Sequence, residues 1–287
     1  MRGSGNNLGN GGALGGRLRL EEMSVVFQST SGEDVHAVRD FSLKTEPGEF
    51  VCIVGPSGCG KSTVLNVIAG FVDCTSGEVL LDGEPILLPN PERGVVFQEH
   101  ALFPWKSVAA NVEFGLKMQG VGKTERQRVA EEYIQQVGLT GFKSKYPHEL
   151  SGGMAQRVGI ARVLASNPGV MLMDEPFGSL DAQTRGRMQE LLLDIWEKYK
   201  KTIVFVTHDL DEAIFLSDKI ALMTASPGTV KQVFNNSLPR PRMPDIYTAE
   251  AFLELKVEMM TMLRKEMEEA QVKWKMQITD SNPGSSA

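Results

Sequence analysis

The fold of this chain is decided by one stretch, Gly55-Pro56-Ser57-Gly58-Cys59-Gly60-Lys61-Ser62-Thr63. It fits the pattern G-x-x-x-x-G-K-[ST], in which glycines let successive backbone N–H groups turn inward and hold phosphate oxygens at a helix N-terminus. The buried-strand pattern Val51-Cys52-Ile53-Val54 precedes the stretch, and an apolar, helix-like segment, residues 64–69, follows it. Because strand, loop and helix are the context that the motif needs, the sequence predicts a phosphate-binding loop here.

Three further runs are informative in combination with that loop. They are Leu150-Ser151-Gly152-Gly153-Met154-Ala155-Gln156-Arg157, Val170-Met171-Leu172-Met173-Asp174-Glu175-Pro176 and Thr207-His208-Asp209. An apolar run that ends in Asp-Glu is common in buried strands, and a histidine after a strand is usually an ordinary strand-end residue. No recurrent structural need places Ser-Gly-Gly at the start of a helix. The coincidence of all four runs therefore favours a shared function.

The strand patterns outside the loop predict two sheets. Residues 18–27 alternate but change phase near Glu21-Glu22, which indicates a strand pair or a bulged strand. Asp82-Gly83 supplies the positive φ values of a tight hairpin turn, so a small antiparallel sheet is expected around the loop. The apolar runs 94–97, 169–173, 202–206 and 219–223 are separated by helical patterns and predict a parallel sheet covered on both faces.

Helix signals replace strand signals between residues 99 and 165. Thr124-Glu125-Arg126-Gln127 fits a capping box, and Gly138 stands where a C′ glycine belongs. Ser151-Gly152-Gly153 is expected to cap a helix that continues through Arg162. The segment is therefore predicted to be an inserted helical subdomain.

On the four runs together, the chain resembles the ATP-binding subunits of ABC transporters over residues 17–235. The resemblance implies an α/β fold, a P-loop NTPase of RecA-like type with a parallel sheet, an N-terminal antiparallel β-subdomain and the helical insertion. Phe97-Gln98-Glu99-His100-Ala101-Leu102-Phe103-Pro104-Trp105 and the run from Leu150 are similar to those of importers for nitrate, taurine and other sulfonates. The implied activity is hydrolysis of ATP to ADP and phosphate.

The resemblance also implies roles for the loop residues, which phosphoryl transfer to water requires. Lys61 is expected to reach the β- and γ-phosphates, Ser62 to ligate Mg²⁺ and Thr63 to hydrogen-bond near the α-phosphate. Asp174 is expected to hold the metal through water, and Gln98 to contact both Mg²⁺ and water. ATP and Mg²⁺ are therefore the expected cofactors.

Two further residues would complete the hydrolysis chemistry. Glu175 is the implied general base for the attacking water, and His208 the residue that contacts the γ-phosphate. Phe27 is the candidate for stacking on adenine, although a core strand aromatic is the alternative interpretation.

In the family, the remaining contacts come from a second subunit in a head-to-tail dimer. Ser151, Gly152 and Gly153 open a helix, where backbone N–H groups suit an anion, here the partner's γ-phosphate. Asp181 belongs to the matching D-loop, which would pass between the two sites. Either two identical ATPase chains or a related pair would satisfy this arrangement.

Composition agrees with an intracellular enzyme. The formal charge of −6 and pI near 5.4 argue against a dedicated nucleic-acid binder. Three cysteines, Cys52, Cys59 and Cys74, show no C-x-x-C pairing, so neither disulfides nor zinc are expected. No stretch approaches the ~20 apolar residues of a membrane span. The family resemblance implies a peripheral location on the cytoplasmic face of the membrane, bound to permease subunits, with a solute-binding protein as an indirect partner.

The two ends of the chain and three single residues complete the sequence-based expectations. Residues 1–16 are rich in Gly and Asn and are expected to be a flexible extension, and residues 236–287 to form a tail with an amphipathic helix. Met154 replaces the glutamine of the commonest family signature. Cys59, beside Lys61 and a helix N-terminus, is expected to be a reactive thiolate. Trp105 either packs in the core or meets the permease.

Three other functions stay open as alternatives. The first is an importer ATPase for a different solute. The second is a soluble, non-transport ABC protein that binds DNA, RNA or the ribosome, for which tandem cassettes, a coiled-coil insertion or a basic surface are expected. A P-loop kinase is the third, but it leaves residues 150–157 without a purpose.

Overall fold

A computed structural model describes residues 15–29, 32–99 and 101–281, with side chains to residue 270. The expected extension, residues 1–16, lies mostly outside these ranges. Its last two residues, Gly15 and Gly16, are buried. The Gly16 carbonyl accepts a hydrogen bond of 2.7 Å from the Thr202 hydroxyl, so both glycines pack with the folded part of the chain.

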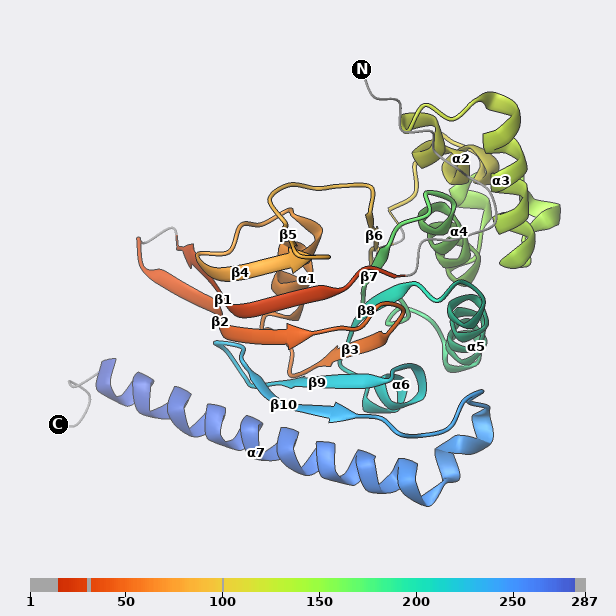
Figure 1. Ribbon diagram of the computed structural model, residues 1–287. Helices are drawn as coiled ribbons and strands as arrows, with labels where there is room; N and C mark the ends of the chain where they lie inside the picture. The colour runs from red at the N-terminus through yellow and green to blue at the C-terminus, as the bar shows by residue number, and fades with distance from the viewer. Residues whose placement is uncertain (1–14, 30–31, 100, 282–287) are drawn as a thin grey trace.

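A six-stranded sheet forms the centre of the molecule, in the order β10-β9-β3-β8-β7-β6 (Figure 1). Five strands pair in parallel and only the edge strand β10 is antiparallel. The strands are β3 (Phe50–Val54), β6 (Arg93–Val96), β7 (Val170–Asp174), β8 (Thr202–Thr207), β9 (Lys219–Met223) and β10 (Val230–Asn235). The predicted parallel sheet is thus confirmed.

A smaller antiparallel sheet, in the order β2-β1-β4-β5, packs over the first helix. Its strands are β1 (Leu18–Gln28), β2 (Asp34–Lys44), β4 (Ser76–Leu81) and β5 (Glu84–Pro85). The register of β1 slips between Glu21 and Ser24, where the predicted phase change falls. Gly77 permits this bulge, because a Cβ at its φ of 83° would lie 2.4 Å from the Glu22 carbonyl oxygen. The predicted Asp82-Gly83 hairpin is also present.

The central sheet divides the core into two clusters. In β3, Val51 and Ile53 face the antiparallel sheet and helix α1 (Lys61–Ala69), whereas Phe50, Cys52 and Val54 face the remaining helices. Every residue of β3 and β8 is buried, as expected for strands covered on both faces. The helices on the second face include α5 (Ala182–Tyr199) and α6 (Leu210–Leu216).

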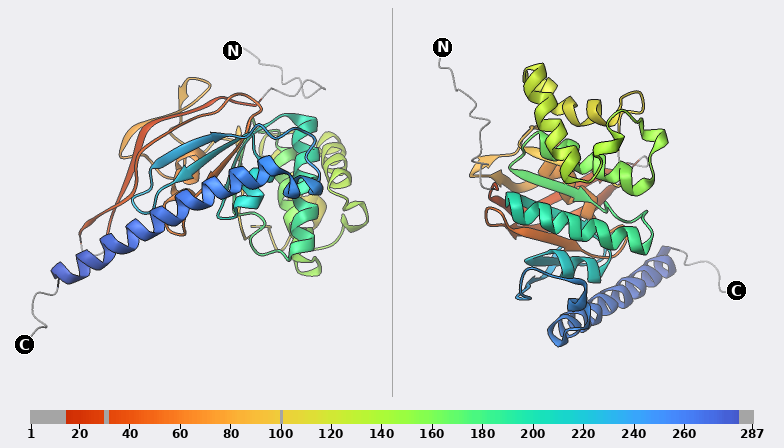
Figure 2. Two further views of the ribbon diagram at one scale, coloured as in Figure 1. Left: turned by 90° about the horizontal axis from the view of Figure 1, so that it is seen from below. Right: turned by 90° about the vertical axis from the view of Figure 1, so that its right-hand side faces the viewer.

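The insertion between β6 and β7 forms a helical group at one end of the molecule (Figure 2). It contains α2 (Val108–Met118), α3 (Lys123–Gln136), α4 (Gly152–Ala165) and the 3₁₀ turns η1 (Thr140–Phe142) and η2 (Pro147–Glu149). Gly138 has a φ of 70° just past α3, as predicted.

The predicted capping box at Thr124 is wrong. Helix α3 is capped by Gly122, whose carbonyl already accepts the first helical hydrogen bond, 3.0 Å from the Arg126 amide. Thr124 therefore lies inside the first turn, where its hydroxyl cannot act as an N-cap. The Arg126 side chain is instead paired with Glu113 of α2 at 2.9 Å.

The C-terminal segment consists of the 3₁₀ turn η3 (Pro244–Thr248) and a long helix, α7 (Glu250–Ser281), which runs past α6 and the edge strand β10 (Figure 1). Phe252 and Met259 of α7 are buried in the core, whereas Met267 is half exposed. Glu266 pairs with Lys231 of β10 at 2.6 Å. No helix among the described residues is long and apolar enough to cross a bilayer.

Candidate functional site

The candidate residues follow the carboxyl ends of adjacent parallel strands. Residues 55–63 connect β3 to α1, Gln98 follows β6, Asp174 ends β7 with Glu175 directly after it, and His208 follows β8. Such strand ends meet at one edge of a parallel sheet, the usual place of a binding site in this architecture. The topology therefore brings together residues that are far apart in the sequence.

The phosphate loop is shaped by its glycines. Gly58 and Gly60 have φ values of 75° and 95°, which L side chains rarely adopt. A Cβ on Gly60 would also lie 2.6 Å from the Ala37 carbonyl oxygen of β2, so the smaller sheet closes tightly on the loop. Lys61 is buried and its ammonium donates hydrogen bonds of 2.9 Å to the carbonyls of Gly55 and Pro56. Two backbone carbonyls of the loop thus fix the position of the lysine side chain.

The expectation of a reactive Cys59 thiolate is wrong. The side chain is only 1% exposed, and burial raises the pKa of its thiol although the Lys61 charge acts in the opposite direction. The sulfur lies inside the loop, 2.8 Å from where a Cβ on Gly55 would stand. Cys59 is a small packing residue there.

Ser62 and Asp174 form a candidate magnesium site. The Ser62 hydroxyl donates a hydrogen bond of 3.1 Å to Asp174 Oδ1. Burial, with a smaller contribution from Glu175, raises the pKa of Asp174, although the Ser62 hydrogen bond and the Lys61 charge oppose this shift. A half-buried carboxylate beside a hydroxyl is a donor set that Mg²⁺ accepts when phosphate oxygens complete its shell. The two residues therefore fit the metal.

Glu175 and His208 contact each other at the ends of β7 and β8. Glu175 Oε2 lies 2.9 Å from His208 Nδ1, and the imidazole is 63% exposed. Glu175 has a φ of 42° and its amide donates to the Val206 carbonyl at 2.9 Å. This left-handed backbone turns the carboxylate out of the strand direction. A Cβ added to Gly178 would lie within 4 Å of both Glu175 Oε2 and Gln98 Nε2, so the Gln98 amide lies near this pair.

The glycine pair Gly152-Gly153 lies where two helices meet. Ser151 caps α4, because its hydroxyl accepts a hydrogen bond of 3.4 Å from the Met154 amide. Gly153 faces α5, where its Cβ would stand 2.6 Å from Thr184 Cγ2. Asp181 caps α5 by accepting from the Thr184 amide at 3.0 Å, which lowers the pKa of Asp181. Ser151 and Gly152 are exposed, so the start of α4 is open to a ligand from outside.

Comparison with known proteins places this geometry in a family. A family model described as ABC transporter matches residues 38–178. An uncharacterized ABC transporter ATP-binding protein of Methanocaldococcus jannaschii is 47% identical over 251 residues, which cover 88% of this chain and 92% of the relative. The chain belongs to the ABC transporter ATP-binding family. It is an ATPase, with the ABC cassette fold that the sequence predicted.

Other relatives of this ABC ATPase are informative about assembly and substrate. An aliphatic sulfonates import ATP-binding protein of Bacillus cereus is 46% identical, over 83% of this chain and 92% of the relative. A cassette solved as a dimer in a post-hydrolysis state with ADP and phosphate is 33% identical, with a TM-score of 0.69 over 77% of this chain and all of that one. A Clostridium perfringens cassette, described as part of an ABC transporter complex, is 29% identical at the same TM-score, over 84% of this chain and 93% of that one.

Phe27 and Trp105 are both exposed in this ABC ATPase. Phe27, near the end of β1, is 43% exposed and pairs with Val35 of β2, which is also exposed. Trp105 precedes α2 and is 72% exposed, with its ring centroid 5.8 Å from that of Phe103. Neither aromatic is a core residue, so the alternative interpretation of each as a core residue is wrong.

Sequence reasoning missed several polar residues beside His208. Thr207, at the end of β8, and Glu212, on α6, are both buried and share a hydrogen bond of 2.5 Å. Arg185 of α5 lies 3.9 Å from Asp209, the N-cap of α6. The spacing Asp209-x-x-Glu212 fits an N-terminal capping pattern and could have indicated the start of α6. No local signal could have shown that Glu212 turns into the core.

Proposed function

We propose that this ABC ATPase energises an importer for a small oxyanion, such as nitrate, taurine or another sulfonate. The observation that carries this proposal is the 46% identity with the aliphatic sulfonates import ATP-binding protein of Bacillus cereus, over 92% of its length. The cassette acts as a peripheral subunit on the cytoplasmic face of the membrane, with permease subunits that receive a solute-binding protein on the other side. ATPases of importers for other solutes remain the second candidate, because the Methanocaldococcus jannaschii relative is uncharacterized.

In the proposed mechanism, the loop from Gly55 to Thr63 holds the phosphates of ATP. Its backbone N–H groups and the start of α1 favour the anion, and Lys61 exchanges the carbonyls of Gly55 and Pro56 for the β- and γ-phosphates. Ser62, Asp174 and Gln98 would hold Mg²⁺, which would supply charge neutralisation when bound. Phe27, whose ring is exposed, stacks on the adenine.

The hydrolysis step is assigned to the Glu175–His208 pair. Glu175 removes a proton from the attacking water, and His208 contacts the γ-phosphate while its Nδ1 stays within 2.9 Å of the carboxylate. The exposed start of α4, with Ser151, Gly152 and Gly153, binds the γ-phosphate held by a second copy. Asp181, at the start of α5, lies between the two sites of the dimer. The cassette dimer with ADP and phosphate supports this arrangement.

Reconstitution tests the proposed substrate class. The chain is assembled in liposomes with permease subunits, and ATP hydrolysis is measured with solute-binding protein loaded with a sulfonate, taurine or nitrate. One of these solutes is expected to stimulate hydrolysis, and a Lys61→Ala complex serves as the control without activity. Stimulation by a solute of another class, with none by the oxyanions, would overturn the proposal.

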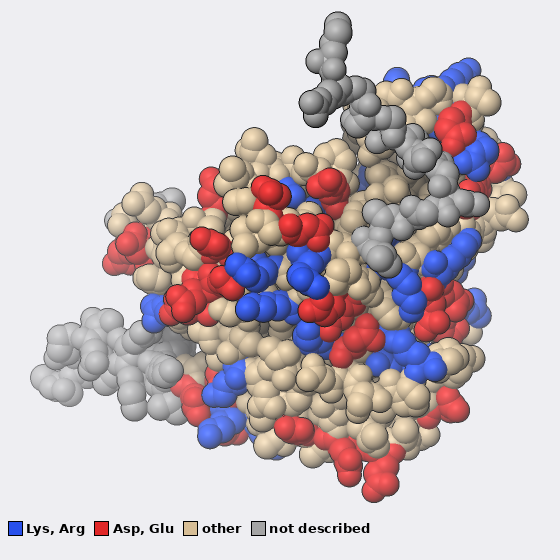
Figure 3. Space-filling view, viewed as in Figure 1, with Lys and Arg blue, Asp and Glu red and all other residues tan. Residues whose placement is uncertain are grey.

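The charge on one face of the molecule argues against nucleic-acid binding there. On the face shown in Figure 3, Lys and Arg side chains alternate with Asp and Glu side chains, and no broad basic area forms. Proteins that bind nucleic acids usually gather positive charge on one face. This face therefore does not suit nucleic acid.

A further inference from the structure

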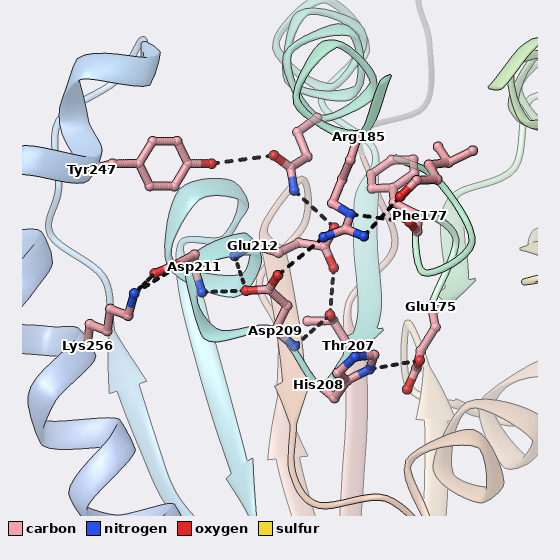
Figure 4. Close-up of polar contacts among 12 residues, drawn as sticks. Glu175, Phe177, Arg185, Thr207, His208, Asp209, Asp211, Glu212, Tyr247 and Lys256 are labelled. Carbon is pink, nitrogen blue, oxygen red and sulfur yellow. Dashed lines mark hydrogen bonds and ion pairs between the residues drawn. The ribbon is translucent and has the colours of Figure 1, made fainter. Parts of the chain in front are cut away.

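The backbone on both sides of His208 is held by hydrogen bonds (Figure 4). The Thr207 hydroxyl donates to Glu212 Oε2 at 2.5 Å and accepts from the Asp209 amide at 3.0 Å. Asp209 Oδ1 in turn accepts from the amides of Asp211 and Glu212, at 2.9 and 3.3 Å. The position of the imidazole therefore depends on how α6 is placed, because β8 and α6 are joined through these bonds.

The chain of hydrogen bonds continues to the C-terminal segment. Glu212 Oε1 accepts from Gln189 Nε2 of α5 at 3.1 Å, and Gln189 Oε1 accepts from the Tyr247 hydroxyl of η3 at 3.4 Å. Tyr247 thus reaches Thr207, next to His208, through two intermediate side chains. These contacts join a residue outside the predicted ATPase domain, 17–235, to the hydrolysis site.

Further contacts fix α6 to the C-terminal segment. The Tyr247 ring stacks on Phe215 of α6, with centroids 5.2 Å apart and planes 13° apart. Lys256 of α7 pairs with Asp211 at 2.7 Å. The Arg242 guanidinium donates to the carbonyls that end α6, including that of Ser217 at 2.7 Å. The segment therefore holds both ends of α6.

Glu212 is costly to bury. It is only 5% exposed, and burial raises the pKa of its carboxyl despite hydrogen bonds from Thr207 and Gln189, which lower it. Both hydrogen-bond donors are neutral groups, so the contacts do not neutralise the charge. A buried carboxylate of this kind is weak evidence for stabilisation. Instead, the two carboxylate oxygens of Glu212 fix the positions of Thr207 and Gln189, because each oxygen accepts one hydrogen bond.

We propose that the C-terminal segment, residues 236–270, positions His208 and so sets the rate of ATP hydrolysis through Tyr247, Gln189, Glu212 and Thr207. This inference rests on the proposed role of His208. None of the four residues contacts the reacting atoms, so each is a positioning residue. Loss of one of these hydrogen bonds lets α6 and the end of β8 shift relative to Glu175. The hydrolysis step then slows, while ATP binding by the phosphate loop is unchanged.

Tyr247→Phe tests the outermost link in the full chain. The variant keeps the ring that stacks on Phe215 and loses only the hydroxyl. We expect the kcat for MgATP hydrolysis to fall about threefold to tenfold, the range of one neutral hydrogen bond. The KM for ATP and the melting temperature are expected to stay nearly unchanged.

Tyr199→Phe is the matched control. Tyr199 is the last residue of α5, and its hydroxyl, like that of Tyr247, donates to a glutamine, Gln136 of α3, at 2.7 Å. It lies outside the Tyr247–Thr207 chain and outside the proposed catalytic and binding residues. Its loss removes the same kind of bond, so kcat is expected to match that of wild type.

Two substitutions at Glu212 test the inner link. Glu212→Ala removes both acceptors and is expected to lower kcat at least tenfold, more than Tyr247→Phe does. Glu212→Gln keeps an acceptor for Thr207, and the Gln189 amide can turn to face it, so kcat is expected to return to within a few-fold of wild type. Failure of Glu212→Gln to restore activity, with a normal melting temperature, would contradict positioning by hydrogen bonds.

His208→Ala separates this inference from the proposed function. If His208→Ala hydrolyses ATP at the wild-type rate, the proposed role of His208 is wrong. If His208→Ala is inactive but Tyr247→Phe and Glu212→Ala behave like Tyr199→Phe, the role of His208 stands and the positioning inference is overturned. An equal fall of kcat in the two tyrosine variants also overturns it.

Discussion

Among the individual residues, burial decides the chemistry more than neighbouring sequence does. Cys59 stands beside a lysine and a helix N-terminus, both of which favour a thiolate, yet its pKa is raised because water cannot reach the sulfur. Asp174 shows the same effect with a useful result, since a desolvated carboxylate gains more from a nearby metal ion than an exposed one. Residue-scale predictions therefore depend on exposure.

Glu175→Gln tests the assignment of the general base. Glutamine keeps the size of the side chain but cannot accept the proton, so hydrolysis is expected to slow by ~10²–10⁴-fold. One negative charge beside the γ-phosphate is also lost, so ATP binding is expected to persist or strengthen. Phosphate release measures the first effect, and size-exclusion chromatography with MgATP detects the ATP-bound dimer that should accumulate.

Lys61→Ala is the control for that experiment, because it weakens nucleotide binding itself and should yield no ATP-bound dimer. Hydrolysis by Glu175→Gln within a few-fold of the wild-type rate would mean that another group activates the water.

Glu212→Gln should change how stability depends on pH. The folded chain holds the Glu212 proton more tightly than the unfolded chain, whose carboxyl titrates near its ordinary value of 4.5. As pH rises above 4.5, the unfolded chain releases that proton first, so the wild type loses stability relative to the variant until the folded carboxyl also ionises. We expect the variant's advantage in unfolding free energy to grow between acidic and neutral pH.

Denaturant unfolding of both proteins across that pH range measures this difference. All other residues are the same in both proteins, so the comparison isolates Glu212. A stability difference that does not change with pH would show that Glu212 is not buried as described.

At the scale of elements, the residues just before α2 present an exposed tryptophan on a well-ordered loop. Trp105 is exposed, while Phe103 packs on Phe114 of α2, with centroids 4.4 Å apart, and beneath Arg162 of α4. Asn111 of α2 fixes the loop, because its side-chain amide donates to the Phe103 carbonyl at 3.2 Å and its oxygen accepts from the Phe103 amide at 2.9 Å. A firmly held loop with an exposed tryptophan suits a partner surface.

Trp105→Ala tests this interpretation. Because the ring is 72% exposed, its removal should leave the melting temperature of the isolated chain within a few degrees of wild type. Assembly with the permease should weaken, or hydrolysis should continue without transport. Co-purification and uptake into liposomes measure these effects. A large fall in the melting temperature would instead assign Trp105 a packing role.

At the scale of the whole molecule, we propose that a second copy completes the site. Within one chain, the start of α4 lies beside α5, and the phosphate loop lies between β3 and α1, next to the smaller sheet. The two parts of the proposed site therefore belong to different regions of the chain. A head-to-tail dimer with two-fold symmetry would build two such sites, each from the loop of one copy and the α4 start of the other.

Mixing two inactive variants tests the shared site. Lys61→Ala damages the loop, and Gly152→Asp places a carboxylate where the partner's γ-phosphate would bind, at a helix start that tolerates negative charge. A mixed dimer contains one intact site, so an equal mixture is expected to recover up to about a quarter of the wild-type rate. Each variant alone should be inactive. No recovery, with mixed dimers demonstrated by cross-linking, would contradict a site shared between copies.

The fold and most of the candidate site could be predicted from the sequence. Short-range patterns predict the loop 55–63, the strand ends at Asp174 and Thr207, and the Asp82-Gly83 turn. A few adjacent residues are enough here, because they determine the backbone conformation and the burial of a strand. The common edge of a parallel sheet then brings Ser62, Asp174, Glu175 and His208 together with no further information.

Only the tertiary structure decided the remaining features. The burial of Cys59 and the path from Tyr247 to Thr207 depend on segments that meet from distant parts of the chain. Local patterns cannot show them, because the free energy of a buried thiol or carboxylate depends on the neighbours that exclude water and supply hydrogen bonds. The sequence by itself therefore predicted the residues of the proposed ATPase site, whereas only the tertiary structure shows how the C-terminal segment packs against α6 and is linked to that site.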